Sequence, residues 1–559
     1  RPQGLRHQGR QGRRRAGQLQ LNPHNQRIRI MKITHLGLLA SLLFAGIVQA
    51  ADAPAPTKLN TTADHSKFKE LQREFTSGPE VTKACLTCHT EAALQIHRTK
   101  HWTWELVTPL NQQRLGKKNV INNYCLSSGT NLGACATCHV GYGWVNSSFD
   151  FKSQENVDCL VCHDTSGNYK KLPGGGQPPV KDTENPPGSG KIVKAIDLAK
   201  IAQKVGKTSR DTCGACHFFG GGGDGVKHGD MDSSLASPEK EVDVHMDATG
   251  LDFTCSTCHK APAHDVVGSR YTPTGKDAGD AHIRGKVNKS NPATCQSCHG
   301  QAPHKAGAQP AKLNQHTDKV ACQTCHIPQF ARGGVPTKMN WDWSTAGKLS
   351  PEGKPMLKKD AHGHVIYDSR KGDFVVAENV TPEYAWFNGE VTYTLLGDKV
   401  DKSNGITLIN ALGGSASDGR SLIWPMKVMR GSQPYDPVNK TLVKPHVAGN
   451  DDTAYWKNFN WEKAIETGMK AANAPFSGQV DFLKTEMYWP ITHMVAPKEK
   501  AVGCNECHAG GGRLDEIEGI YIPGRDANQL VNLIGWLAAG GTLAGVMLHG
   551  LVRIVRRKN

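Results

Sequence analysis

The chain has 559 residues, a formal net charge of +16 and 17 cysteines. Thirteen of its 67 basic side chains lie in residues 1–50 and 553–559, which hold no acidic side chain, so the charges in between nearly balance. This uneven distribution removes the usual argument that a strongly basic protein binds nucleic acid, and we expect no nucleic-acid partner.

The first fifty residues are typical of a leader rather than of a folded domain. Residues 1–30 begin with Arg1 and are rich in arginine, and we expect them to be a translated upstream region outside the native protein. A basic start at Met31-Lys32 is followed by an apolar run and by small residues before position 51. We therefore predict a signal peptide over residues 31–50 and a periplasmic domain over residues 51–526.

Eight Cys-x-x-Cys-His motifs organise this domain and use 16 of the 17 cysteines. In such a motif the thiols form thioether bonds with haem, and the histidine supplies an axial nitrogen to iron. A zinc site would need further ligands for each pair, and a disulfide framework would not place a histidine after every second cysteine. The sequence therefore predicts eight covalently bound c-type haems. The motifs are Cys85/Cys88/His89, Cys135/Cys138/His139, Cys159/Cys162/His163, Cys213/Cys216/His217, Cys255/Cys258/His259, Cys295/Cys298/His299, Cys322/Cys325/His326 and Cys504/Cys507/His508.

The spacing of the motifs also predicts the fold class. Seven of them begin between residues 85 and 322, which leaves little peptide for each cofactor, so the haems must form much of the core. The alternating apolar runs of long strands are scarce. We expect a mainly α multihaem cytochrome c fold with extensive irregular loops, packed around eight haems. Residues 327–503, which hold no motif, are expected to form a cap on the haem array.

Histidines outside the motifs are candidates for the second axial position of each iron. A haem with two histidine ligands is six-coordinate, so it carries electrons but binds substrate poorly, and catalysis needs one iron with an open or displaceable position. For each candidate, a surface histidine is the alternative. The candidates are His97 or His101, His228, His245, His264, His282, His304, His316 and His493; His65, His362, His364 and His446 are weaker ones.

One loop after the fourth motif combines two further ligand types. Its sequence is Asp224-Gly-Val-Lys227-His228-Gly-Asp230, and a glycine run precedes it. A neutral lysine amine can bind ferric iron and is more easily displaced than imidazole, and burial near a metal favours loss of its proton. The alternative is a solvated Lys227 beside a ligating His228.

Taken together, these features resemble the octahaem tetrathionate reductase family, which is related to the pentahaem nitrite reductases and hydroxylamine oxidoreductases. The resemblance extends over about residues 85–508. It is carried by the eight motifs, His97-x3-His101-Trp102, the loop from Asp224 to Asp230, Cys322-x2-Cys-His-Ile-Pro, Pro336-Thr-Lys-Met-Asn-Trp-Asp-Trp343 and Thr492-His-Met-Val-Ala-Pro497.

The resemblance implies an active haem attached at the second motif. Lys227 would be its displaceable distal ligand, with Asp224 as a neighbour and His139 as the proximal ligand. The family also has a free cysteine near this haem, a role that falls to Cys125, the one cysteine outside the motifs. A thiolate there could exchange with a sulfur–sulfur bond; the alternative is an inert buried cysteine.

The function that the resemblance implies is the reduction of a small inorganic substrate, either a sulfur oxyanion or a nitrogen oxide. Tetrathionate would be split to thiosulfate, or nitrite or hydroxylamine would be reduced. Two alternatives remain open: an enzyme that oxidises hydroxylamine, and an electron conduit with eight closed haems.

The C-terminal region, residues 527–559, is predicted to be a membrane anchor. Residues 530–555 form a largely apolar run whose only formal charge is Arg553, and it is long enough to cross a bilayer. The basic residues Arg553, Arg556, Arg557 and Lys558 predict a cytoplasmic C-terminus. Glycines along the span suggest a membrane partner, which would be a quinol-oxidising b-type cytochrome subunit. His549 either packs inside this span or binds a b-type haem with that partner.

Overall fold

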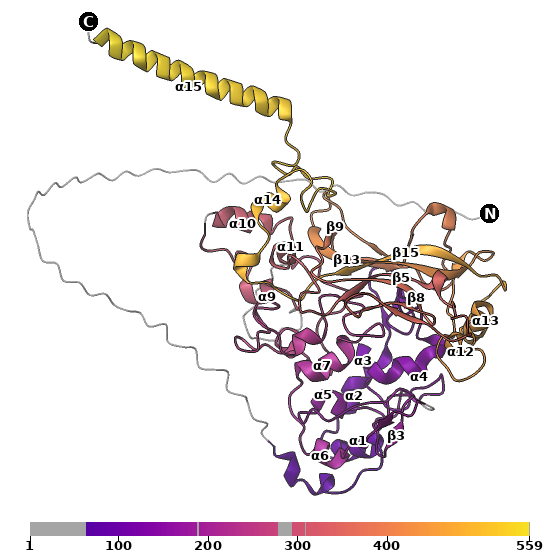
Figure 1. Cartoon of the computed structure of the whole chain (residues 1–559). Coiled ribbons are helices and arrows are strands. Elements are labelled where there is room, and N and C mark those ends of the chain that lie inside the picture. Colours follow the sequence, from indigo (N-terminus) through magenta and orange to yellow (C-terminus); the bar gives the residue numbers. More distant parts are fainter. Residues whose placement is uncertain (1–62, 187–188, 278–292, 308, 558–559) are drawn as a thin grey trace, which may run out of the picture. The chain divides into compact units, whose positions relative to one another are not determined.

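The computed structural model describes residues 63–186, 189–277, 293–307 and 309–557 (Figure 1). The expected upstream region, the expected signal peptide and His282 lie outside these residues. The first seven motifs lie in a part of the chain built from short helices and loops, and the region after them contains most of the strands.

The motifs lie on or beside single helical turns. The two cysteines of a motif are three residues apart, so one turn of helix directs both thiols to the same side. Local capping fixes where such turns begin: α7 (Arg210–His217) starts after Ser209, whose hydroxyl accepts a hydrogen bond from Thr212 N at 3.1 Å. The other motif helices are α1 (Gly78–Leu86), α4 (Leu132–Cys135), α5 (Leu160–His163), α8 (Cys255–Cys258), α9 (Gln296–His299), α11 (Cys322–His326) and α14 (Cys504–Cys507).

Further helices lie outside the motifs, in addition to the C-terminal helix described below. They are α2 (Ala92–His97), α3 (Lys100–Thr103), α6 (Leu198–Ala202), α10 (Pro310–His316), α12 (Tyr455–Asn458) and α13 (Trp461–Ala471). Short 3-10 helices lie at His65–Lys67, Lys69–Leu71, Gly129–Asn131, Ala136–Cys138, Ser233–Ala236, Pro262–His264, Trp343–Thr345, Lys402–Asn404 and Lys498–Lys500.

A nine-stranded sheet makes up much of the region after the seventh motif. Its path is β11-β15-β13-β5-β8-β7-β6, and β9 and β14 also pair with β13. The strands β13, β15, β5 and β8 lie side by side in Figure 1. Its members are β5 (Thr337–Asp342), β6 (Leu357–Lys359), β7 (Val365–Asp368), β8 (Gly372–Ala377), β9 (Glu383–Phe387), β11 (Thr407–Leu408), β13 (Leu422–Asp436), β14 (Thr441–Leu442) and β15 (Asp481–Pro490).

Smaller two-stranded pairs complete the strand inventory of the described residues. They are β1 (Leu106–Val107) with β2 (Arg114–Leu115), β3 (Thr183–Glu184) with β4 (Ile192–Val193), and β10 (Val391–Tyr393) with β12 (Asn410–Leu412).

The sheet corrects two expectations, that long strands are scarce and that the fold is mainly α. The central strand β13 runs over 15 residues and pairs antiparallel with β15, from Met426 opposite Pro490 to Tyr435 opposite Asp481. Nearly all of β13 is buried on both faces, so its apolar residues do not alternate with exposed polar ones. Polar side chains within it, such as Lys427 and Gln433, are buried and hydrogen-bonded. Because of these buried polar residues, the strand lacks the alternation of apolar and polar residues by which strands are predicted from sequence.

The largest apolar core packs on this sheet. Its buried aromatic residues include Tyr124, Trp341, Trp343, Trp424 and Trp489. It is continuous with the site because Trp341, Trp343 and Trp489 also line the large cavity described in the next section.

The C-terminal helix α15 (Gln529–Arg557) has the composition expected of an anchor. Its apolar window has a mean hydropathy of 1.6, and none of its residues is buried. By length and composition it can cross a membrane.

Candidate functional site

A single cavity of about 3320 Å³ runs through the motif-bearing region. Its volume is several times the roughly 300–1,000 Å³ of a site for one small molecule. All 17 cysteines line it, together with fifteen histidines. The thiols that the sequence assigns to haem attachment therefore converge on one continuous space.

Seven motif histidines each face a second histidine across this cavity. The ring centroids of the pairs are 6.0–6.4 Å apart. Two metal–nitrogen bonds of about 2 Å each, plus the distance from each nitrogen to its ring centre, give a separation of this size. The pairs are His89–His65, His163–His264, His217–His101, His259–His493, His299–His245, His326–His304 and His508–His316.

The second ring nitrogen of many of these histidines is held by a hydrogen bond. A partner on Nδ1 fixes the ring and leaves Nε2 free for a metal. Motif histidines use backbone carbonyls for this purpose, and their opposite partners use backbone or side-chain oxygens. The Nδ1 contacts are His163 to Gly206 O (2.8 Å), His259 to Val267 O (2.9 Å), His508 to Pro523 O (2.9 Å), His264 to Gln95 Oε1 (2.7 Å), His316 to Lys312 O (2.7 Å), His304 to Asn314 Oδ1 (3.1 Å) and His493 to Asp230 Oδ2 (3.2 Å).

Burial keeps paired imidazoles in the form that binds a metal. It lowers the pKa of His101 and lowers that of His217 to about 4. Both rings are therefore neutral at pH 7, as an axial ligand must be. The cysteines, the paired neutral rings and the shape of the cavity all fit covalently bound haem c.

These pairs also sort the histidine candidates from the sequence. His245, His264, His304, His316 and His493 each lie opposite a motif histidine, as listed above. Of the alternatives His97 and His101, the ring opposite His217 is that of His101. His97 instead stacks on Trp102, with its Nε2 3.3 Å from Ser153 O.

His65 is a site residue that sequence reasoning ranked too low. It lies in a short 3-10 helix at the start of the described chain, and its ring stacks at 6.4 Å from that of His89. It precedes the first motif by twenty residues, and no feature of the sequence there distinguishes a ligand from a surface histidine. The useful clue was that every motif histidine needs a partner, including the first.

His228 does not have the placement expected of a distal histidine. It lines the cavity, but its ring packs edge-on against Trp489, with centroids 4.9 Å apart, and no motif histidine of the described chain lies opposite it. Of the weaker candidates, His364 lies 3.2 Å from Asp360 and His446 lies 3.0 Å from Asp451, while His362 stacks on His364, and none of the three lines the cavity.

His139, the histidine of the second motif, is the exception among the motif histidines. It is fully buried but does not line the cavity. Its Nε2 lies 2.7 Å from Trp102 O, so this nitrogen must donate a proton to the carbonyl, and Nδ1 has no partner among the described residues. Aromatic side chains surround the ring, namely Trp102, Trp104, Trp144, Phe149 and Phe151. In this arrangement Nε2 of His139 is engaged by a backbone carbonyl, and its role as proximal ligand stays a prediction.

Lys227 lies in the cavity near the second motif. Its side chain is 7 % exposed, and its Nζ lies 5.0 Å from the centre of the Trp489 ring. Burial, and then the charge of Arg270, hold the pKa of Lys227 well below its usual range, while negative charge on Cys125 or Cys135 would act in the opposite direction. A buried, neutral amine next to the cysteines of the second motif is the form of lysine that can bind a metal.

The loop around Lys227 is fixed by the sheet. Lys427 of β13 extends its Nζ to Val226 O at 3.2 Å, to Lys227 O at 3.0 Å and to Thr337 Oγ1 at 2.5 Å. Gly229 has φ +78°, and a side chain there would meet the ring of Phe330 at 2.8 Å. The sheet thus presents Lys227 to the cavity from a backbone with little freedom.

Asp224 points elsewhere. Its carboxylate accepts hydrogen bonds from the backbone N of Ser233 at 2.9 Å and from the Ser233 hydroxyl, and it is not among the residues that line the cavity. The structure also shows turns, not a helix, between Asp224 and Lys227. The carboxylate therefore braces the loop and does not line the cavity into which Lys227 extends, where a neighbour of the active haem was expected.

Cys125 lines the cavity and lies close to several lysines. Its backbone N donates to Asn122 Oδ1 at 3.2 Å, which holds the thiol's loop in a tight turn. A negative charge on Cys125 would raise the pKa of Lys227, Lys338 and Lys371, so all three lie within electrostatic reach of its sulfur. Cys125 and Lys227 thus line the same cavity, within electrostatic reach of each other.

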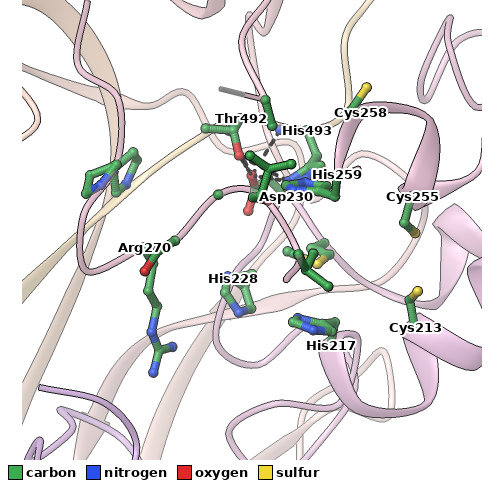
Figure 2. A pocket seen from close by; sticks show the side chains of 18 of the residues that line it. Cys213, His217, His228, Asp230, Cys255, Cys258, His259, Arg270, Thr492 and His493 are labelled. Atoms are coloured by element: carbon green, nitrogen blue, oxygen red, sulfur yellow. Dashed lines mark hydrogen bonds and ion pairs between the residues drawn. The ribbon is translucent and has the colours of Figure 1, made fainter. Parts of the chain in front are cut away.

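The neighbouring pair His259–His493 shows how the same loop reaches a second site (Figure 2). Asp230, three residues after Lys227, accepts hydrogen bonds from the backbone N of Thr492 at 2.8 Å and of His493 at 3.1 Å. Its Oδ2 also lies 3.2 Å from His493 Nδ1. One short loop therefore carries Lys227 and orients an imidazole of the adjacent pair.

The geometry and the cysteine motifs define a multihaem c-type cytochrome, and comparisons with known proteins agree. A crystal structure of an octahaem cytochrome c from Shewanella oneidensis matches with a TM-score of 0.69 and 42% sequence identity, over 80% of this chain and 94% of that chain. The bacterial cytochrome c family matches residues 338–511. An uncharacterized protein of Archaeoglobus fulgidus is 27% identical over 241 residues, which are 36% of this chain and 80% of that protein. The chain belongs to the octahaem cytochrome c family and is a redox protein with covalently bound haem c.

Proposed function

We propose that the protein is an octahaem oxidoreductase whose substrate binds beside Lys227, in the part of the cavity next to the second motif. The observation that carries this proposal is the division of the motifs. Seven motif histidines face a second histidine, whereas His139 of the second motif is hydrogen-bonded to Trp102 O and Lys227 lies in the cavity within electrostatic reach of Cys135. A haem attached to Cys135 and Cys138 would supply redox-active iron to this space.

The side chains around Lys227 suit a small anion. Arg270 lies with its guanidinium 4.6 Å from the centre of the Trp489 ring, and Lys227 lies over the same ring. His228 packs against its edge. Once Lys227 is displaced and gains a proton, it adds a positive charge next to Arg270, in a buried setting where such charges act strongly on a bound anion.

The resemblance to octahaem tetrathionate reductases favours a sulfur oxyanion as substrate. Reduction of tetrathionate takes two electrons, breaks the central S–S bond and yields two thiosulfate ions. We infer that Cys125, which lines the same cavity as Lys227, contacts such a sulfur chain. Nitrite and hydroxylamine are the other candidate substrates. The opposite direction, hydroxylamine oxidation, and a conduit without a substrate site are the competing functions.

The test combines spectroscopy with turnover. The mature protein should carry eight covalent haems by mass, and one haem should differ from seven low-spin haems in its EPR spectrum. Lys227→Ala should make that haem high-spin and lower turnover of tetrathionate or nitrite with a viologen donor. Lys227→His should close the position and suppress binding of added ligands.

The exposed Lys240 supplies the control, because Lys240→Ala removes a lysine from the same stretch of chain without touching the cavity. An unchanged spin state and normal turnover in Lys227→Ala would refute the proposal and favour the conduit.

A further inference from the structure

The large cavity continues beyond Cys125 into the sheet region, where Trp343, Lys371 and Trp456 line it. Contacts through Trp341 connect these residues. The rings of Trp341 and Trp343 stack at 4.8 Å, Trp341 Nε1 donates to Lys371 O at 2.7 Å, and Lys371 Nζ lies 5.8 Å from the centre of the Trp456 ring. None of these three lining residues belongs to a haem motif or to a histidine pair.

We call the part of the cavity lined by Trp343, Lys371 and Trp456 the chamber. Two indole groups that line it carry buried hydrogen-bond donors without acceptors. The Nε1 atoms of Trp343 and Trp456 are buried and have no partner among the described residues, and the Trp343 side chain is only 2 % exposed. Trp102, Trp341, Trp386 and Trp424, by contrast, donate to backbone carbonyls at 2.7–3.0 Å. Trp489 Nε1, beside Lys227, is a further buried donor without a partner among the described residues. A buried donor without an acceptor is unusual, and an indole can only donate, so a ligand here must offer acceptor atoms.

The lysines near the chamber favour an anion among the ligands that offer hydrogen-bond acceptors. Lys371 lies within electrostatic reach of Cys125 and of the buried Lys338. Asp368 is the acidic group that acts on both lysines, and its carboxylate is already held by the Arg370 guanidinium at 3.1 Å. Burial lowers the pKa of Lys371, and a bound anion would offset that effect by stabilising the ammonium form. Positive charge and free donors together favour an anion.

We propose that Trp343, Trp456 and Lys371 form a binding site for a small inorganic oxyanion, adjacent to Cys125 and distinct from the residues around Lys227. The site would hold the anion on its way to or from the reaction site, and in this respect it rests on the proposed function. Cys125 connects the two, because its sulfur lies within electrostatic reach of both Lys371 and Lys227. In this proposal, residues of the sheet region bind the anion in addition to forming the core.

The experiment distinguishes anion binding at this site from anion binding at the iron. It uses the Lys227→His variant, in which the iron position is expected to be closed. Thiosulfate is titrated into the oxidised, haem-loaded Lys227→His protein by isothermal titration calorimetry. One thiosulfate should bind per chain although the iron position is closed. Trp456→Phe keeps the ring but removes the N–H, and Lys371→Gln removes the charge; each change, made in this background, should raise the Kd by about tenfold, the effect of losing one good polar contact.

Trp386→Phe is the matched control, because the Trp386 indole N–H is already bonded to Glu518 O at 2.8 Å outside the cavity. It should leave the Kd unchanged. Trp343→Phe should behave like Trp456→Phe and guards against a folding defect in one variant. Absence of thiosulfate binding to the closed variant, or equal affinity in Trp456→Phe, Trp343→Phe and Lys371→Gln, would overturn the inference. Neither outcome depends on turnover, so a failure here is distinct from a failure of the Lys227 proposal.

Discussion

His101 and His217 face each other with ring centroids 6.2 Å apart, although His217 closes the fourth motif and His101 lies between the first and second. A haem attached at Cys213 and Cys216 would thus be completed by a distant segment of the chain. A similar pairing of residues far apart in the sequence joins His316 of α10 to His508, just after α14. Figure 1 shows these two helices next to each other. Such pairing links each segment to the others through the cofactors, because neither partner alone closes the coordination.

The His101–His217 pair can be tested against its close neighbour. His101→Ala should remove one axial ligand and convert one low-spin haem to a high-spin or water-ligated form, visible by EPR. His97→Ala is the matched control, since His97 stacks on Trp102 and faces no motif histidine. It should leave all haems low-spin that are low-spin in the wild type. A new high-spin haem in His97→Ala, and none in His101→Ala, would reverse the assignment.

The local parts of the site were predictable from the sequence, whereas the long-range pairings were not. The spacing of the sixteen motif cysteines identifies them, whereas the roles of Lys227 and Cys125 are implied by the family resemblance and stay predictions. Which histidine faces which motif depends on tertiary contacts, so His65 was ranked too low and His228 too high. Aromatic side chains from segments on both sides of the motif pack around His139 and fix its orientation. No local sequence pattern predicts this orientation.

The sheet escaped prediction for a related reason. Strand β13 is buried along nearly its whole length, and its polar residues make specific internal hydrogen bonds instead of facing water. Alternation of apolar and polar residues marks strands with one solvated face, so it has no power here.

Asp230 should tune the potential of the haem between His259 and His493. Burial lowers the pKa of His493, but the hydrogen bond and charge of Asp230 outweigh it, and the pKa is raised overall. A carboxylate acceptor on Nδ1 makes the imidazole a stronger donor to ferric iron. Asp230→Asn should therefore raise one midpoint potential, by roughly 40 mV if the weaker acceptor costs about 1 kcal/mol.

Spectroelectrochemical titration of the haem-loaded protein measures this shift. Asp232→Asn is the control on the same loop, because the Asp232 carboxylate accepts from Ser234 and not from a ring nitrogen. A downward shift in Asp230→Asn, or an equal shift in both variants, would exclude a specific effect through His493.

The buried ion pair between Lys171 and Asp158 should be a major stabilising contact near the second and third motifs. Their Nζ and Oδ2 atoms are 3.1 Å apart, and the side chains are 4 % and 0 % exposed. Lys171→Met leaves a buried carboxylate without its cation and should lower the free energy of unfolding by about 3–5 kcal/mol. Denaturant unfolding of the haem-loaded protein, followed by circular dichroism, measures the loss.

An exposed pair in the same part of the chain provides the comparison. Lys194 and Asp182 are 2.6 Å apart, but their side chains are 78 % and 49 % exposed. Lys194→Met should cost only about 0–1 kcal/mol. Equal losses for Lys171→Met and Lys194→Met would show that burial does not strengthen the Lys171–Asp158 pair.

Removal of residues 527–559 should separate membrane attachment from catalysis. The helix α15 has no buried residue and is apolar enough to cross a bilayer, so its loss removes no packing from the haem-binding region. The truncated protein should be recovered in the periplasmic soluble fraction with its full haem content and should keep viologen-driven turnover. It should lose turnover driven by quinol in membranes, since a quinol-oxidising b-type partner would no longer hold it. Retained quinol-driven activity would argue for a soluble electron donor instead, and loss of viologen activity would mean that α15 contributes to the fold.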